Sequence, residues 1–129
     1  MHIGELVRRN LVAVGPTHTL AEAASMMVDR NVGSAVVVTD EAPGIVSERD
    51  ILRAIASGVD PKTAKVADHM TWNAVSAAPT WDVAQAARTM IAGGFRHLVV
   101  VDETREIGIL SIRDLVFALF GEHEEAGGR

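Results

Sequence analysis

The chain of 129 residues contains no cysteine and no tyrosine, and aromatic residues make up only 4% of it. Without cysteine the protein has no disulfide, no catalytic thiol and no cysteine-based zinc site. A chain free of cysteine also suits a reducing compartment. Because the chain is nevertheless 48% hydrophobic, we expect a globular core built from alanine, valine, isoleucine, leucine and methionine.

Other absences narrow the function. The formal net charge of −5 disfavours nucleic acid and anionic membranes as partners. No apolar run has membrane-spanning length and no signal peptide is recognisable, so we expect a cytoplasmic protein. The five histidines lack metal-binding spacing, and neither a nucleophile elbow nor a phosphate loop occurs. We therefore expect no enzyme activity, no metal site and no required cofactor.

What the sequence does contain is one octapeptide written twice. Residues 44–51 (GIVSERDI) return 64 positions later as residues 108–115 (GILSIRDL). Other segments match at an offset of 63, as residues 36–38 match 99–101. Such a repeat means one structural unit used twice. Since each half is short for an independent domain, we expect both repeats to share one core.

Each repeat predicts the order strand, helix, strand, strand, helix, an α/β layout. Apolar residues recur at helical spacing from Leu20 onward, and Thr19 with Glu22 predicts a capping box at the start of that helix. Asn31 in the first repeat and the pair Gly93-Gly94 in the second are expected to end the first helix of each repeat. The predicted strands are 12–14, 35–38 and 44–46 in the first repeat and 74–76, 97–101 and 107–110 in the second.

The duplication, the order of elements, residues 66–71 (VADHMT) and both Gly-hydrophobic-hydrophobic-Ser-x-x-Asp motifs resemble a tandem pair of cystathionine-β-synthase (CBS) domains, a Bateman module. The pattern is similar to the nucleotide-binding γ subunits of AMP-activated protein kinase. The resemblance implies two β-α-β-β-α repeats with pseudo-two-fold symmetry. The expected divisions are a first CBS motif at 3–58, a linker at 59–65, a second CBS motif at 66–120 and a flexible tail at 121–129.

The serine and aspartate of each motif stand where a helix begins. As helix caps, Ser47 with Asp50 and Ser111 with Asp114 satisfy free backbone N–H groups and the helix dipole. A helix N-terminus also favours phosphate and other polar oxygens, and the resemblance implies that the aspartate accepts hydrogen bonds from both hydroxyls of a ribose. The two roles are compatible.

The resemblance also implies two nucleotide pockets, each completed by the other repeat. We favour the pocket of Asp114, because large side chains at the second strand start crowd the other pocket. Gly33 either permits close approach of the ligand or serves only as a turn at the helix exit. Around Asp114 and Ser111 we expect Ala13, Gly33, Ser34 and Ala35. Around Asp50 and Ser47 we expect Val75, Ser76, Arg96, His97 and Leu98.

Four cationic residues lie near the motifs in sequence, namely Arg49, Arg96, His97 and Arg113. They are either solvated surface charge or a cluster that neutralises phosphate, to which arginine is suited by its bidentate contacts. Trp72 and Trp81 flank the short strand at 74–76, and we expect them in the core or in a dimer interface rather than stacked on a base.

We therefore expect a stand-alone regulatory module that binds an adenine nucleotide, namely AMP, ADP or ATP, with S-adenosylmethionine less favoured. It would signal to an unidentified client protein through a change of shape or assembly. The alternative is a ligand-independent dimerisation or scaffold module. Family members dimerise through the last helix of each repeat, and we expect a homodimer for the same reason. The apolar residues on these helices are Ile51, Leu52, Ile55, Leu115, Val116, Leu119 and Phe120.

Overall fold

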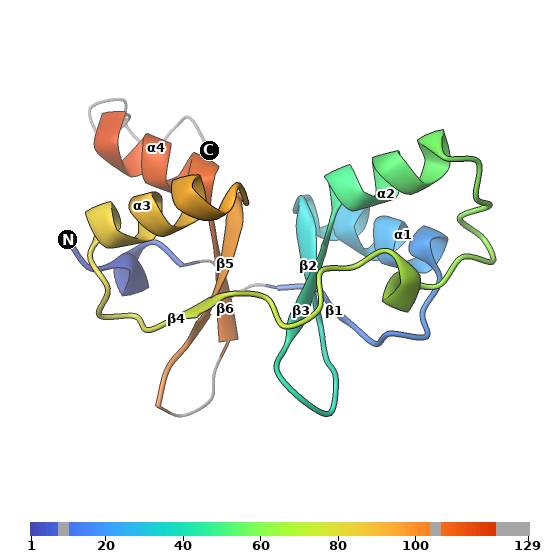
Figure 1. The fold of residues 1–129 in the computed structure, drawn as a ribbon, viewed down its shortest axis with the longest axis horizontal. Helices are drawn as coiled ribbons and strands as arrows, with labels where there is room; N and C mark the ends of the chain where they lie inside the picture. The colour runs from blue at the N-terminus through green and yellow to red at the C-terminus, as the bar shows by residue number, and fades with distance from the viewer. Residues whose placement is uncertain (8–10, 104–106, 121–129) are drawn as a thin grey trace. The chain divides into compact units, whose positions relative to one another are not determined.

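The computed structural model describes residues 1–7, 11–103 and 107–120, and the chain divides into two compact units. The first-repeat unit is Asn10–Ala74, and the second-repeat unit combines Met1–Arg9 with Val75–Arg129. Each unit contains one three-stranded sheet and two α-helices, as Figure 1 shows. The predicted α/β class is confirmed. The predicted tail at 121–129 lies outside the described residues.

In the first-repeat unit the sheet order is β1-β2-β3. Strand β1 runs parallel to β2, which runs antiparallel to β3. Helix α1 connects β1 to β2, α2 follows β3, and both helices lie on the same face of the sheet (Figure 1). The elements are β1 (Ala13–Val14), α1 (Leu20–Arg30), β2 (Ser34–Val37), β3 (Gly44–Ser47) and α2 (Glu48–Ala56).

The second-repeat unit has the same topology, with sheet order β4-β5-β6 and with α3 and α4 on one face (Figure 1). Strand β4 is parallel to β5, and β6 is antiparallel to it. The boundaries of all six strands differ from the predicted ones by two residues at most. The elements are β4 (Ser76–Ala77), α3 (Val83–Gly93), β5 (His97–Val101), β6 (Ile107–Ser111) and α4 (Ile112–Phe120).

Local side chain–backbone contacts explain where the first helix of each repeat begins and ends. The Thr19 hydroxyl accepts from the Glu22 N–H (3.1 Å), and the Glu22 carboxylate accepts from the Thr19 N–H (2.8 Å). That second bond lowers the pKa of Glu22. Asn31 (φ 55°) and Gly94 (φ 71°) end α1 and α3 in the left-handed conformation. The predicted capping box and both helix stops are confirmed.

Most of the buried hydrophobic side chains belong to two clusters, one in each unit. In the first-repeat unit, Leu20 and Met27 of α1 pack with Ile51 of α2 and with the sheet. In the second-repeat unit, Met90 of α3 packs with Leu115 of α4 in the same way. Each unit therefore has a hydrophobic cluster of its own. Each pair of helices buries its apolar face on the sheet of its own unit.

Two short 3-10 helices, η1 (Ile3–Glu5) and η2 (Val66–Asp68), are exchanged between the repeats. Ile3 belongs to the core of the second-repeat unit, where its N–H donates to the Trp81 carbonyl (2.9 Å). Val66 belongs to the core of the first-repeat unit, where its N–H donates to the His18 carbonyl (2.8 Å). The predicted motif limits describe the repeated sequence, whereas the compact units divide the chain differently.

The predicted linker at 59–65 lies against the beginning of α1. The carbonyl oxygens of Pro61 and Ala64 accept hydrogen bonds from the N–H groups of Ala21 and Leu20, both at 2.9 Å. These bonds satisfy donors that a helix N-terminus otherwise leaves free. Among the described residues, no helix combines the length and the hydrophobicity needed to cross a bilayer.

Candidate functional site

The motif of the first repeat forms a closed capping box at the start of α2. One oxygen of Asp50, Oδ2, accepts from the Ser47 N–H (2.8 Å) and from the Ser47 hydroxyl (3.0 Å). In return, the Asp50 N–H donates to Ser47 Oγ (3.2 Å). The Ser47 hydroxyl thus donates and accepts within the same pair of residues. The predicted capping role of this motif is confirmed.

The motif of the second repeat has the same cap but a more buried carboxylate. Asp114 Oδ2 accepts from the Ser111 N–H (3.0 Å), and the Asp114 N–H donates to Ser111 Oγ (3.1 Å). Asp114 is only 6% exposed, whereas Asp50 is half-buried. Removing a carboxylate from water costs free energy unless hydrogen bonds compensate. The structure therefore distinguishes the two aspartates by their burial.

Each motif lies beside the start of the middle strand of its own sheet. Ser34 of β2 pairs with Ser47, and His97 of β5 pairs with Ser111. In the described part of the chain, the outer strand β1 pairs with Val36 and Val37. Among the described residues, the ladder between β1 and β2 continues with backbone bonds from Val36 to Val12 (2.9 Å) and from Val38 to Val14 (2.8 Å).

Gly33 has a close neighbour that the sequence analysis did not single out. The Glu48 N–H donates to the Gly33 carbonyl (2.9 Å), and a Cβ on Gly33 would lie 2.5 Å from Glu48 Oε2. Gly33 does not have a positive φ, and the left-handed turn at the helix exit falls on Asn31. The close approach of Glu48 to its Cα, and not an unusual backbone conformation, is therefore the reason for a glycine at this position. The sequence contains a signal for this contact, because the two octapeptides differ at this position, with Glu48 in the first and Ile112 in the second.

The remaining predicted pocket residues differ in how deeply their side chains are buried. Ala35 and Leu98 have fully buried side chains in the two core clusters, so only their backbone atoms can reach a ligand. Ser34 is 7% exposed. Ala13, Val75 and Ser76 are exposed.

The predicted cationic residues are divided between the units. Arg49 belongs to the first-repeat unit, and Arg96, His97 and Arg113 belong to the second-repeat unit. The three arginines are exposed and His97 is half-buried. The Arg96 carbonyl accepts from the Ile112 N–H (2.8 Å), which ties this position to the second motif. Their exposure agrees with solvated charge and with phosphate binding alike.

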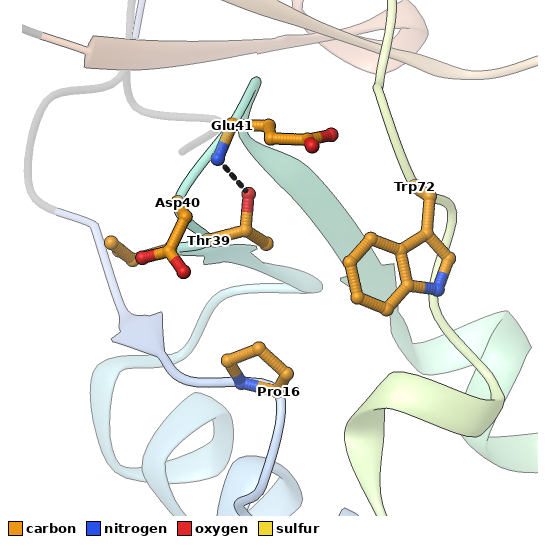
Figure 2. Close-up of a pocket in the computed structure, with 6 residues that line it drawn as sticks. Pro16, Thr39, Asp40, Glu41 and Trp72 are labelled. Atoms are coloured by element: carbon orange, nitrogen blue, oxygen red, sulfur yellow. Dashed lines mark hydrogen bonds between the residues drawn. The ribbon is translucent and has the colours of Figure 1, made fainter.

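The two tryptophans differ in their packing. Trp81 is half-buried against the core cluster of the second-repeat unit, as predicted. Trp72 is 50% exposed and lines a hollow of the first-repeat unit (Figure 2). Trp72 is therefore not a core residue, because the segment that carries it lies at the outer edge of β3, and its alternative place in a dimer interface stays a prediction.

The CBS domain model matches residues 3–57 and 66–121 of the chain. An uncharacterized protein of Methanopyrus kandleri is 31% identical over 118 residues, covering 88% of this chain and 60% of that protein. The chain thus spans less than two thirds of the length of that relative.

Two solved structures have closely similar folds. The CBS domain protein PAE2072 from Pyrobaculum aerophilum, solved in complex with AMP, is 34% identical with a TM-score of 0.81. The match covers 98% of this chain and all (100%) of that chain. The hexameric CBS-CP12 protein from bloom-forming cyanobacteria is 27% identical with a TM-score of 0.88, and the match covers 95% of this chain and 74% of that chain.

Proposed function

This chain belongs to the CBS domain family as a tandem pair of CBS domains, and we propose that it binds an adenine nucleotide at the motif around Asp114. The observation that carries the proposal is the burial of a capped carboxylate at this position. Asp114 is 6% exposed, and its Oδ2 is held by the Ser111 N–H. A carboxylate held in this way is oriented before a ribose arrives, so less ordering accompanies binding.

The ligand class is supported by the structural neighbour from P. aerophilum, which was solved with AMP. We extend the proposal to AMP, ADP and ATP as a class, with S-adenosylmethionine as a weaker ligand. Backbone groups at the start of β2 are proposed to read the adenine, because Gly33 has no Cβ that would block a close approach. The first-repeat residues included in this pocket are Ala13, Gly33, Ser34 and Ala35.

The motif around Asp50 in the first repeat is proposed as a second, weaker nucleotide site. Asp50 is half-buried, whereas Asp114 is 6% exposed, so water competes more strongly for hydrogen bonds to the Asp50 carboxylate. Arg49, Arg96, His97 and Arg113 are proposed to attract the phosphate, since arginine binds phosphate in bidentate geometry. Val75, Ser76 and Leu98 complete this second site in the proposal.

Signalling is proposed to proceed through assembly as well as shape. Leu52 (67% exposed) and Ile55 (49%) on α2, and Leu119 (53%) and Phe120 (72%) on α4, present apolar surface to solvent. Exposed apolar surface of this kind marks interaction sites. We propose a homodimer that uses these helices. A nucleotide changes the signal of this dimer only if it binds one conformational or assembly state more tightly than another.

A ligand-independent dimerisation or scaffold module is the second candidate, because the capping boxes and the exposed helices explain much of the structure without a nucleotide. Thermal unfolding with AMP, ADP, ATP and S-adenosylmethionine separates the two candidates. A ligand that binds only the folded state at 100 times its Kd stabilises that state by about 2.7 kcal/mol. We expect a clear rise in Tm with AMP. An unchanged Tm with every nucleotide, from a protein that remains dimeric, favours the scaffold.

A further inference from the structure

A hollow in the first-repeat unit lies apart from both serine–aspartate motifs. Figure 2 shows Trp72 on one side, the turn with Thr39, Asp40 and Glu41 on the other, and Pro16 below. Its volume is about 380 Å³, which is at the lower end of the range for small-ligand sites. No residue of the proposed nucleotide site lines it.

The wall that carries Trp72 is held in place by backbone contacts. Trp72 Nε1–H donates to the Ala67 carbonyl (3.0 Å). The preceding residue, Thr71, exchanges two backbone hydrogen bonds with Ile45 of β3 (2.8 and 3.1 Å). A Cβ on Gly44 would lie 2.6 Å from the Thr71 carbonyl oxygen, so this approach requires glycine. The indole is thus half exposed yet oriented before any ligand binds.

The opposite wall is a turn that carries two carboxylates. The Thr39 hydroxyl accepts from the Glu41 N–H (3.1 Å) and donates to the Ala42 carbonyl (2.9 Å), which fixes the turn. Asp40 and Glu41 are both exposed. Val38, the residue that follows β2, is 56% exposed and adds an aliphatic surface. The hollow therefore combines an aromatic ring, aliphatic surface and two negative charges.

These three surfaces match the parts of an arginine side chain. A guanidinium stacks on an indole through a cation–π interaction, and its fork of N–H donors fits a carboxylate. Its methylene stem packs on apolar surface while the charged head stays near water. The same two carboxylates repel phosphate, which separates this hollow from the proposed nucleotide site. The net charge of −5 also favours approach by a basic partner.

The repeat itself indicates that the fold does not require this tryptophan. At the offset of 63, the counterpart of Trp72 is Arg9, which lies outside the described residues, and the counterpart of Asp40 is Glu103. The second-repeat unit thus has the same topology, although its sequence has no tryptophan at the matching position. A tryptophan that is half exposed and not needed for the topology is available for binding.

We propose that the hollow between Trp72 and the turn at Asp40 and Glu41 binds an arginine side chain from a basic segment of a protein partner. The inference is independent of the nucleotide, because it uses none of the residues proposed to bind it. The protein partner would therefore carry an exposed arginine in a segment free of nearby acidic residues.

The test is a titration of the full ¹⁵N-labelled chain with the peptide acetyl-Gly-Ser-Arg-Ser-Gly-amide, followed by NMR at low salt. The protein has two tryptophans, so two indole N–H signals are observed, and Trp81 serves as an internal control. We expect the Trp72 signal to shift and saturate while the Trp81 signal does not move. The same peptide with glutamine in place of arginine should leave both signals unchanged.

A charge-matched pair of variants tests the carboxylates. D40N/E41Q removes both charges from the hollow, and we expect it to weaken peptide binding by about fivefold or more. D29N/E103Q removes two charges from exposed positions that do not line the hollow, and its affinity should equal that of the wild type. The inference is overturned if the Trp72 signal stays fixed at millimolar peptide, if the glutamine peptide binds equally well, or if both variants lose affinity equally.

Discussion

Glu48 lies directly over Gly33. The backbone N–H of Glu48 donates to the Gly33 carbonyl (2.9 Å), and its carboxylate oxygen Oε2 would lie 2.5 Å from a Cβ on Gly33. In the second repeat the same backbone bond joins Ile112 to Arg96 (2.8 Å). The same hydrogen bond thus joins Gly33 to the acidic Glu48 in the first repeat. In the second repeat it joins the cationic Arg96 to the apolar Ile112. The starts of β2 and β5 therefore differ in charge, although both have this backbone hydrogen bond.

The space above Gly33 can be tested with Gly33→Ala. Because φ is not positive there and the nearest atom is the end of a flexible Glu48 side chain, we expect the free energy of unfolding to change by less than about 1 kcal/mol. If backbone groups at this position read the adenine, the added methyl should weaken AMP binding by about tenfold, as overpacking does. Urea denaturation and calorimetry measure the two quantities.

The double variant Gly33→Ala with Glu48→Ala is the control for that experiment. It gives the new methyl group room, so any loss of stability should be recovered while the loss of AMP affinity persists. Full recovery of AMP affinity in the double variant would instead assign the effect to the Glu48 side chain, and an AMP affinity unchanged in Gly33→Ala would contradict the close approach.

The ribose assignment predicts unequal effects of the two aspartates. Asp114→Asn keeps an oxygen that can accept from the Ser111 N–H, but it loses the charge. Hydrogen bonds to a charged group contribute about 1.5–3 kcal/mol, so AMP should bind at least about tenfold more weakly. Asp50→Asn should have a smaller effect, since Asp50 is less buried than Asp114 and water competes more for hydrogen bonds there. Calorimetry on both variants decides, and a loss at Asp50 alone would mean that the preferred site is the other one.

Phosphate recognition predicts a dependence on salt. If Arg96 and its cationic neighbours neutralise phosphate, AMP should bind more tightly than adenosine, and the difference should shrink as screening grows with ionic strength. Arg96→Ala should narrow the difference while leaving adenosine affinity nearly unchanged. Titrations at low and high salt measure this, and equal affinities for AMP and adenosine at low salt would assign these residues to solvated surface.

Homodimer formation is tested by light scattering at micromolar concentration. Leu52→Glu with Leu119→Glu places two charges on the exposed apolar surface of α2 and α4, and we expect a monomer mass because burying an unpaired charge in an interface is costly. Lys62→Glu changes the net charge at an exposed position of the linker and should leave the dimer intact. A wild-type monomer mass, with or without nucleotide, would refute the dimer.

The elements of this fold could be predicted because they depend on neighbours close in the chain. The capping box of Thr19 and Glu22 joins residues three positions apart, and Asn31 ends its helix through its own backbone conformation. The duplicated octapeptide predicted two capped helices, and Ser47–Asp50 and Ser111–Asp114 form those caps. Hydrophobic periodicity and side chain–backbone hydrogen bonds act over a few residues, so the sequence alone contains them.

Contacts between residues distant in the chain required the tertiary structure. Periodicity does not say which core receives Ile3, and the structure packs it with the second repeat. The same limit applies to the burial of Asp114, to Glu48 above Gly33, and to the half-exposed ring of Trp72. Each depends on how helices and loops pack against a sheet, and the identity of a residue does not specify what lies on top of it.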